Sequence, residues 1–383
     1  MKSAIGPLRL VALAIFCPGL IFGQGWIQTS APTKPWQALA MSADGSKLVA
    51  AVNSGGIYTS TNFGATWISN NAPILGWDAL TSSADGSRLA AAYLGGIYIS
   101  TDGGATWNPS AVRSAYWYSL ACSADGTLLA AATPSGNAVY VSTNFGLSWK
   151  TNSFPTGIYD GYSVGVSASG NRIAAGNNIG IILVSTNLGA NWSTTNQLTG
   201  SIKSIAVSAD GAMIAAVYGG ATVYTSTNGG VSWMSTNVVN SDFVSIAGSA
   251  DGTRLVTVGG TSLAVSAFST DSGTSWTTSS QPAPIWRAVA SSADGNFLAA
   301  AANNGGIWFW RTAVPPRLNI VPSGSLAKIS WTLPSTNFVL QQSADLQNWA
   351  TVTNSPTLNL RTLQDEFAVT ATNGQSFYRL TTP

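Results

Sequence analysis

The chain has 383 residues, of which 45% are hydrophobic and only 8% are charged, with a formal net charge of +2 and no histidine. So small and balanced a charge excludes both a basic surface for nucleic acid and an acidic field for cations. The surface must instead be rich in serine, threonine, asparagine and glycine, which fits an exported protein that avoids nonspecific ionic partners.

Residues 1–23 have the pattern of a secretory signal peptide. Lys2 and Arg9 precede an apolar run at residues 10–16, and small residues near Gly23 suit cleavage. A membrane anchor is the alternative, but the run is short of the roughly 20 apolar residues that a spanning helix needs. We therefore exclude this segment from the fold and expect a secreted protein, extracellular, periplasmic or at the cell surface, without a membrane span in the mature chain.

Residues 24–313 repeat two phrases, a strand ending in the letters SADG and a strand ending in STNxGxxW. In the second repeat, strands at residues 77–83, 88–93 and 97–101 precede a fourth strand that carries Trp107. The Asp-Gly and Gly-Gly pairs between the strands supply the positive φ angles of tight hairpins. Four strands in about 40 residues are typical of a propeller blade, so we predict an all-β, seven-bladed β-propeller.

The fourth strand of six repeats carries a tryptophan, while the second strand is made mostly of small residues. Inner strands of neighbouring blades lie close together, whereas outer strands must fill wider gaps. We therefore interpret the tryptophans as structural wedges rather than ligand contacts. They recur 40 to 43 residues apart, at Trp67, Trp107, Trp149, Trp192, Trp233 and Trp276.

The turn before each of these tryptophans is the most specific motif in the sequence. Its third residue is either Asp or Asn, so charge is dispensable there. Both residues offer a side-chain oxygen that accepts backbone N–H bonds, and a glycine two residues later is free to adopt the left-handed conformation. A calcium site would need several carboxylates, so we expect no metal and no cofactor at these turns. The six residues are Asn62, Asp102, Asn144, Asn187, Asn228 and Asp271.

These turns resemble the Asp-box, or BNR repeat, of several propeller families. Those families include sialidases, xyloglucan-cleaving glycosidases, sortilin-type receptors and photosystem assembly factors. The resemblance implies a propeller fold, but a shared fold does not select among these functions. The resemblance to the assembly factors favours a protein partner.

The chain begins out of phase with its repeat. Residues 25–29 carry Trp26 ten residues before Trp36, which is the spacing between an outer strand and the next blade, but they lack the three strands that should precede them. The seventh repeat has the converse defect, because no Asp-box follows residues 305–312. We predict that residues 25–29 complete the last blade, close the ring and cover an exposed sheet edge.

Residues 314–383 lack the repeat, and their alternating apolar pattern predicts a small C-terminal β-sandwich. The strings LQQSADLQNW and FYRL resemble a C-terminal module of secreted bacterial proteins, for which no activity carries over. We do not interpret SADLQNW as a seventh Asp-box, because Asp345 and Trp349 are one residue too close and the glycine is absent.

Residues suited to catalysis are scarce. A sialidase needs three arginines and a tyrosine activated by a glutamate, yet residues 24–313 contain no glutamate. A glycosidase with two aspartates needs carboxyl groups roughly 5 to 9.5 Å apart. Outside the repeated turns the predicted propeller offers only Asp78, Asp160 and Asp242, which fall in alternate repeats. We assign no catalytic residue.

The end of the ring opposite the repeated turns differs from one repeat to the next. Packing positions stay alike because every blade solves the same problem, so unlike side chains indicate a surface shaped for a ligand. The alternative is that the tryptophans only fill the space between blades and that the other residues are neutral surface. The candidate binding residues are Trp36, Trp77, Asp78, Trp117, Tyr118, Tyr162, Lys203, Trp286 and Arg287.

Three functional hypotheses follow. The first is a secreted, noncatalytic protein that binds a protein or glycan partner at this surface, because aromatic rings stack on sugar faces and on exposed polypeptide alike. The second is a glycoside hydrolase or lyase acting on extracellular polysaccharide, and the third is a structural component of the cell envelope. A binder needs a concave aromatic and polar mouth, an enzyme needs two carboxylates in one cleft, and a structural protein needs neither.

Overall fold

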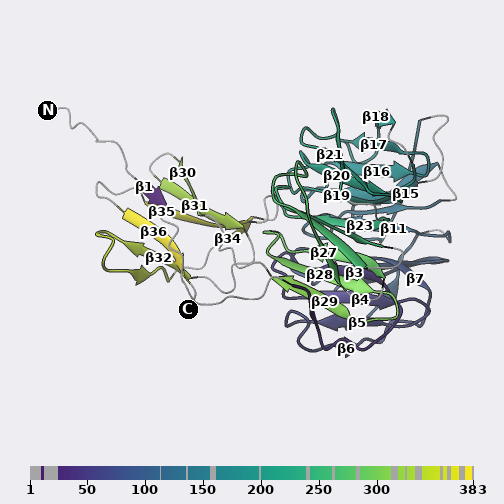
Figure 1. The fold of residues 1–383 in the computed structure, drawn as a ribbon, viewed down its shortest axis with the longest axis horizontal. Coiled ribbons are helices and arrows are strands. Elements are labelled where there is room, and N and C mark those ends of the chain that lie inside the picture. The colour runs from purple at the N-terminus through teal and green to yellow at the C-terminus, as the bar shows by residue number, and fades with distance from the viewer. Residues whose placement is uncertain are drawn as a thin grey trace.

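The computed structural model describes residues 10–12, 25–112, 114–134, 137–155, 161–197, 200–238, 242–260, 264–281, 285–311, 318–323, 326–332, 339–353, 357–359, 364–370 and 376–381. All regular structure in this part of the chain is β, which confirms the predicted all-β class. Within the same residues there is no helix of the length and hydrophobicity needed to cross a membrane. Figure 1 shows one large body of stacked sheets and a smaller body built from the C-terminal strands.

Seven four-stranded antiparallel sheets follow the repeat. Their first strands contact one another in sequence order, and the last contacts the first. These first strands are β3 (Trp36–Met41), β7 (Trp77–Ser82), β11 (Ser119–Cys122), β15 (Gly161–Val166), β19 (Ile202–Val207), β23 (Phe243–Gly248) and β27 (Trp286–Ser291). The second strands are β4 (Leu48–Val52), β8 (Leu89–Tyr93), β12 (Leu129–Ala132), β16 (Ile173–Asn177), β20 (Ile214–Tyr218), β24 (Leu255–Gly259) and β28 (Phe297–Ala302).

The third and outer strands complete these sheets away from the centre of the ring. The third strands are β5 (Ile57–Ser60), β9 (Gly96–Ser100), β13 (Ala138–Ser142), β17 (Ile181–Ser185), β21 (Thr222–Ser226), β25 (Ala264–Ser269) and β29 (Ile307–Arg311). The outer strands are β6 (Ile68–Ser69), β10 (Asn108–Pro109), β14 (Lys150–Ser153), β18 (Ser193–Gln197), β22 (Met234–Asn237), β26 (Thr277–Gln281) and β2 (Ile27–Gln28).

The seventh sheet takes its outer strand from the other end of the chain. Strand β2 pairs antiparallel with β29, with Ile27 opposite Phe309. Beside β2, the buried indole Nε1 of Trp26 donates to Ser266 Oγ at 2.9 Å, and Thr29 Oγ1 donates to the Ile307 carbonyl at 2.8 Å. Strands about 280 residues apart in sequence are therefore joined in one sheet, which covers the edge of β29.

A circle of backbone hydrogen bonds links the SADG turns of six sheets and the corresponding SASG turn of the fourth, at residues 167–170. The alanine N–H of each turn donates to the alanine carbonyl of the next, with N···O distances of 2.6 to 3.0 Å, and the seventh turn donates back to the first. Six of the seven alanines also pack in one hydrophobic cluster. We call this the alanine circle; its members are Ala43, Ala84, Ala124, Ala168, Ala209, Ala250 and Ala293.

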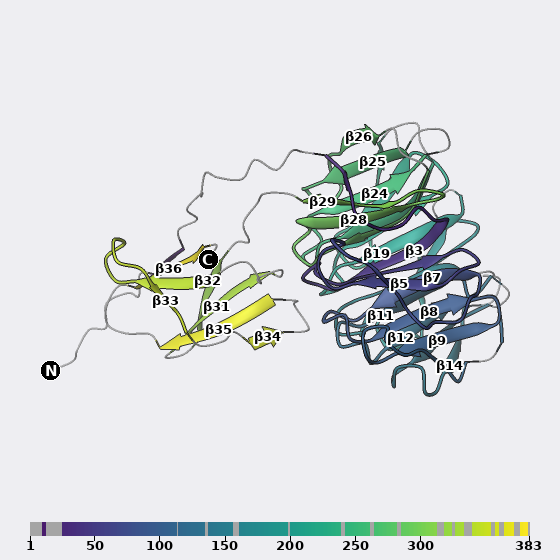
Figure 2. The ribbon, with the colours of Figure 1, turned by 90° about the horizontal axis from the view of Figure 1, so that it is seen from below.

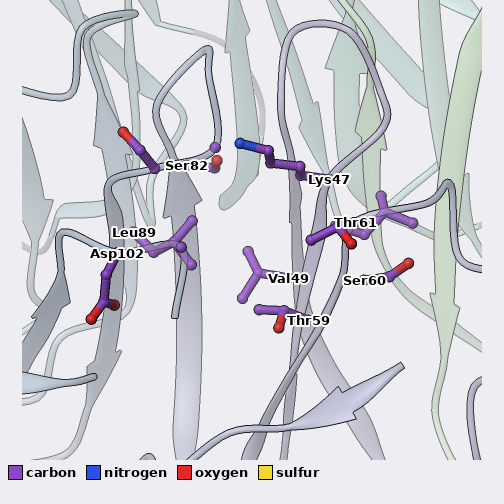
Figure 3. Close-up of a pocket in the computed structure, with 12 residues that line it drawn as sticks. Lys47, Val49, Thr59, Ser60, Thr61, Ser82, Leu89 and Asp102 are labelled. Carbon is purple, nitrogen blue, oxygen red and sulfur yellow. The ribbon is translucent and has the colours of Figure 1, made fainter. Parts of the chain in front are cut away.

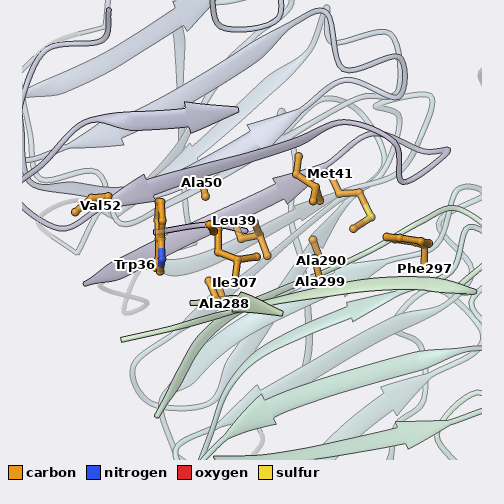
Figure 4. Close-up of a cluster of buried hydrophobic side chains, with 13 residues drawn as sticks. Trp36, Leu39, Met41, Ala50, Val52, Ala288, Ala290, Phe297, Ala299 and Ile307 are labelled. Atoms are coloured by element: carbon orange, nitrogen blue, oxygen red, sulfur yellow. The ribbon is translucent and has the colours of Figure 1, made fainter. Parts of the chain in front are cut away.

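The hydrophobic core lies between neighbouring sheets. The second strands are almost fully buried and rich in alanine, which allows the sheets to approach closely near the centre. Figure 4 shows the cluster between the first and seventh sheets, where Trp36 and Leu39 from β3 lie across from Ala288 of β27. Burying one tryptophan removes on the order of 200 Å² from water, worth about 5 kcal/mol before entropy is subtracted.

The smaller body contains two further four-stranded sheets (Figure 2). In sheet order they are β30 (Asn319–Ser323), β31 (Leu326–Thr332), β35 (Gln364–Thr370) and β34 (Thr357–Asn359), and then β1 (Leu10–Ala12), β36 (Ser376–Thr381), β32 (Val339–Ser343) and β33 (Ala350–Thr351). Buried side chains of both sheets share one cluster, in which Ile329 and Trp331 meet Leu340 and Tyr378.

One strand of the smaller body comes from the segment that the sequence analysis excluded from the fold. Strand β1 pairs in parallel with β36, with Leu10 opposite Ser376. The other residues up to position 23, which carry the rest of the signal-peptide pattern, lie outside the described residues. If the segment is removed on export, β36 becomes the edge of its sheet.

The turn at SADLQNW is closer to an Asp-box than its spacing predicts. Ser343 Oγ donates to Asp345 Oδ1 at 3.0 Å, and the indole Nε1 of Trp349 donates to the Leu346 carbonyl at 3.2 Å. Leu346 takes the positive φ of 65° that a glycine would otherwise adopt. The aspartate accepts N–H bonds from residues two and three positions later, so the turn is a related but shorter structure.

Candidate functional site

The ring has two ends with different structures. The turn end carries the SADG turns, the alanine circle and the Asp-box turns. The bulge end is the opposite one, where the first strand of each sheet begins and where the second and third strands are joined.

Each Asp-box turn at the turn end is held by the same three side-chain hydrogen bonds. In the second sheet, Ser100 Oγ donates to Asp102 Oδ1 at 2.8 Å and accepts the Gly104 N–H at 2.9 Å, while Asp102 Oδ1 accepts the Thr106 N–H at 2.9 Å. Equivalent bonds form at the other five turn residues, namely Asn62, Asn144, Asn187, Asn228 and Asp271. The turn therefore uses the amide or carboxylate oxygen and not a charge.

Hydrogen bonding to the Asp102 carboxylate lowers its pKa to about 2, chiefly through the Thr106 hydroxyl. Within the described residues, no group of three or more His, Cys, Asp or Glu side chains is arranged to hold a metal ion. The oxygen atoms of these turns are thus used within the turns themselves.

Two successive residues in each Asp-box turn adopt positive φ angles, whereas sequence reasoning anticipated only the glycine. The preceding position also lies in the left-handed region, which disfavours side chains with a Cβ by about 1–2 kcal/mol. That position is occupied by Phe63 (58°), Gly103 (68°), Phe145 (52°), Leu188 (60°), Gly229 (70°) and Ser272 (59°). Its side chain decides how neighbouring sheets pack at the turn end.

A pocket of about 210 Å³ lies at the turn end between the first and second sheets (Figure 3). Lys47 reaches over it and donates to the Asp85 carbonyl at 2.7 Å. Gly103 lines it and has no side chain to fill it. At the equivalent place between the fourth and fifth sheets, Arg172 donates to the carbonyl of Gly229 at 2.8 Å. The pocket is therefore a packing gap left by the shorter lysine.

The residues that open the first strands at the bulge end are buried between sheets. Trp36, Trp77, Trp117 and Trp286 have no exposed surface, like their counterparts Ile202 and Phe243. The Trp77 indole Nε1 also donates to the Gly55 carbonyl of the preceding sheet at 3.0 Å. A partner at the surface would not contact these rings, so the four candidate tryptophans fill the space between sheets.

The next residue of each first strand lies in a β-bulge, which the sequence did not reveal. Trp36 pairs with Val52 and Ala38 with Ala51, so that Gln37 has no partner in the ladder. The same irregularity occurs at Asp78, Tyr162, Lys203, Val244 and Arg287. In the third sheet, β11 starts one residue after Tyr118. Bulges redirect side chains out of the alternating strand pattern and are common beside binding sites.

The bulge residues differ in exposure and in charge around the ring. Arg287 is exposed, Tyr118 is 36% exposed, and Asp78 and Lys203 are half-buried. Tyr162 lies in the bulge of β15, while its side chain is outside the described residues. In chain order the acidic and aromatic residues belong to the second to fourth sheets and the basic ones to the fifth and seventh. The charge of the bulge residues therefore differs from sheet to sheet.

Among the bulge residues, Asp78 has the most strongly shifted pKa. Burial raises the pKa of its carboxyl from 3.8 to about 6. Within the described part of the chain, Asp78 accepts no hydrogen bond and forms no ion pair, so nothing offsets the cost of desolvating its charge. Because the folded pKa exceeds the unfolded one, the stability of the fold falls as the pH rises from about 4 to 6.

The carboxylates suited to hydrolysis are distributed over different sheets. Asp78 belongs to the second sheet, and Asp242 directly precedes β23 of the sixth. Asp160 lies outside the described residues. These positions do not identify a catalytic pair.

Comparison with known proteins agrees with this architecture. Residues 98–109, which include the turn at Asp102, match the model of the BNR/Asp-box repeat. Together with the four-stranded antiparallel sheets, this match supports a β-propeller that carries BNR repeats. No sequence among curated proteins matches the chain.

Several solved structures share the fold at low sequence identity. YCF48 from Cyanidioschyzon merolae is 16% identical and has a TM-score of 0.58, with 75% of this chain and 98% of that chain covered. A structure of YCF48 bound to D1 peptide is 15% identical with a TM-score of 0.59 and coverages of 77% and 99%. A chain from the mitotic checkpoint complex is 16% identical with a TM-score of 0.62 and coverages of 79% and 98%.

Proposed function

We propose that this chain is a seven-bladed propeller, closed by β2 and followed by a β-sandwich, that binds a protein partner at its bulge end without catalysing a reaction. The observation that carries the proposal is the bulge repeated in six sheets, which places a different side chain at the same place in each. Positions that only pack one blade against the next stay alike from repeat to repeat, so this variation favours ligand contact over a packing role.

The structural neighbours support a protein as the partner. One YCF48 structure contains a bound D1 peptide, and another neighbour is a chain of a multiprotein complex. Carbohydrate binding remains part of the test, because exposed tyrosine rings also stack on sugars.

The proposal is tested by affinity capture from cell-envelope extracts and by a glycan array. The test variant replaces Asp78, Tyr118, Lys203 and Arg287 with alanine. A control variant replaces Lys150, Thr151 and Met234, which are exposed and lie on the outer strands β14 and β22 rather than on a first strand. We expect the wild type and the control to capture the same protein and the test variant to lose it. Capture unaffected by the test variant, or a glycan as the bound species, would overturn the proposal.

We also infer that the protein is exported and loses residues 1–23. The motivation is the charged, apolar and small-residue pattern of that segment. Intact mass of the protein recovered outside the cytoplasm measures the cleavage directly. A full-length chain recovered only from the cytoplasm would contradict export.

A further inference from the structure

At the bulge end of the second and third sheets, the half-buried Asp78 and three exposed residues lie at the joined ends of neighbouring strands. Asp78 lies in the bulge of β7, opposite the end of β8 at Tyr93. Leu94 follows and makes a β-bridge with Tyr116, the residue two before Tyr118. We call Asp78, Leu94, Tyr116 and Tyr118 the Asp78 patch.

The loop contacts hold the two sheets together at this patch. Besides the bridge at Leu94, the Gly95 N–H donates to the Ala115 carbonyl at 2.9 Å. The rings of Tyr116 and Tyr118 meet edge to face, with centroids 5.9 Å apart and an interplanar angle of 81°. Both tyrosines are 36% exposed and Leu94 is 68% exposed, so the patch is accessible while its backbone is fixed.

The charge of the patch is negative. Burial and, next, the nearby Asp78 carboxylate raise the pKa of the Tyr116 hydroxyl. The faces of tyrosine rings attract cations through their quadrupole. A half-buried carboxylate without an ion pair among the described residues attracts them more strongly. A cation bound here would restore the electrostatic stabilisation that Asp78 loses on burial.

The apolar part of the patch determines which cation fits. Leu94 and the tyrosine rings offer apolar surface beside the carboxylate, and long basic side chains cover such surface with their methylene groups while their charge remains at a polar site. A small inorganic cation would use the carboxylate alone. The complementary group is therefore a lysine or arginine side chain.

We propose that the Asp78 patch receives a lysine or arginine side chain of the polypeptide that binds the bulge end. The proposal rests on the proposed function, because the basic side chain belongs to that protein partner. It gives Asp78 the role of a specificity-determining residue and predicts a basic residue in the bound segment.

The first experiment measures binding of defined peptides to the protein by NMR titration. The probes are the acetylated amides of Gly-Gly-Arg-Gly-Gly and Gly-Gly-Lys-Gly-Gly, with citrulline and norleucine analogues as uncharged counterparts. We expect the basic peptides to shift the methyl signals of Leu94 and the uncharged ones to bind about tenfold more weakly or worse, the effect of losing one charge-assisted hydrogen bond. Equal affinities, or no shift of Leu94 with the basic peptides, would overturn the proposal.

The second experiment uses matched variants. Asp78→Asn keeps the size of the side chain and removes its charge, so it should lower the affinity for the basic peptides by about tenfold. Lys150→Gln removes an exposed charge from the outer strand β14, away from the bulge residues, and should leave the affinity for these peptides unchanged. Thermal unfolding of both variants verifies that they are folded. An Asp78→Asn variant that binds as tightly as the wild type contradicts the proposal.

Capture of the partner separates this inference from the proposed function. A partner that is retained by Asp78→Asn but lost by the four-residue alanine variant contradicts only the Asp78 patch. A partner retained by both contradicts binding at the bulge end altogether. Loss in both supports both proposals.

Discussion

At the turn end six sheets repeat the same Asp-box hydrogen bonds and all seven join the alanine circle, whereas at the bulge end the six bulges present six different side chains. The Ser hydroxyls and Asn or Asp oxygens of the Asp-box turns are used within the turns, and the N–H groups of the alanine circle join each sheet to the next. The bulge residues stand outside the strand ladders, and Asp78 lacks even a hydrogen bond among the described residues. Satisfied polar groups hold a structure together, whereas a polar group without a partner remains available to a ligand.

Removing β2 should have the largest effect on stability. It tests whether the turn end alone can hold the ring. Deleting residues 25–29 exposes the edge of β29 and removes the buried Trp26 from between the sixth and seventh sheets. Loss of the tryptophan alone is expected to cost about 3–5 kcal/mol of unfolding free energy. Thermal and urea unfolding provide the measurement. The control is Ile68→Gly on the short outer strand β6, where the side chain is exposed. An unchanged melting temperature would show that β2 does not close the ring.

A proline in the alanine circle should break one of its hydrogen bonds. Ala250 occupies the second position of a Ser-Ala-Asp-Gly turn, where proline is tolerated, and its N–H donates to the Ala293 carbonyl at 2.6 Å. Ala250→Pro leaves that carbonyl without its donor and should cost about 1–3 kcal/mol. The control Ala250→Gly keeps the N–H and loses only a methyl group. Urea unfolding that gives equal losses for both would contradict a stabilising role for the circle.

The same Asp→Asn change should affect the stability of the fold differently at the two ends. At Asp78 it removes a charge that burial disfavours, so the variant should be more stable than the wild type above pH 6, by an amount that vanishes below about pH 4. At Asp102 the folded pKa of about 2 lies below the unfolded one, so the wild type loses stability only as the pH falls toward 2. Near neutral pH, Asp102→Asn should change stability by less than about 0.5 kcal/mol, because four sister turns already carry Asn.

Thermal unfolding of both Asp→Asn variants between pH 3 and 8 tests the contrast. Asp102→Ala serves as the control that removes the oxygen as well as the charge, and it should be clearly less stable than Asp102→Asn. If Asp78→Asn were destabilising at pH 7.5, the carboxylate would have a stabilising partner and the difference between the two ends would disappear.

Filling the pocket at the turn end should give a small gain in stability. Lys47→Arg allows a guanidinium to reach the Gly103 carbonyl as Arg172 reaches that of Gly229. Filling such a gap commonly raises stability by about 0.5–1 kcal/mol. Differential scanning calorimetry measures the gain, and Arg172→Lys between the fourth and fifth sheets is the reciprocal control that should lose stability. A loss on Lys47→Arg would show that the pocket is not a packing gap.

Local patterns in the sequence determined the all-β class, the four-stranded sheets and the Asp-box turns. Those features depend on nearby residues: Asp-Gly pairs permit tight hairpins, small residues permit close sheets, and a Ser and an Asn two positions apart complete a turn. Because these turns depend on nearby residues, their resemblance to the BNR repeat can be recognised from the sequence alone.

Only the tertiary structure decided which residues at the bulge end face solvent. The sequence placed Trp36, Trp77, Trp117 and Trp286 among the binding candidates, yet burial between two sheets is a property of residues far apart in the chain. No particular residue type marks the bulge in the sequence, because a bulge arises when two strands pair with unequal numbers of residues. The alanine circle likewise requires all seven turns to meet, which no single repeat can specify.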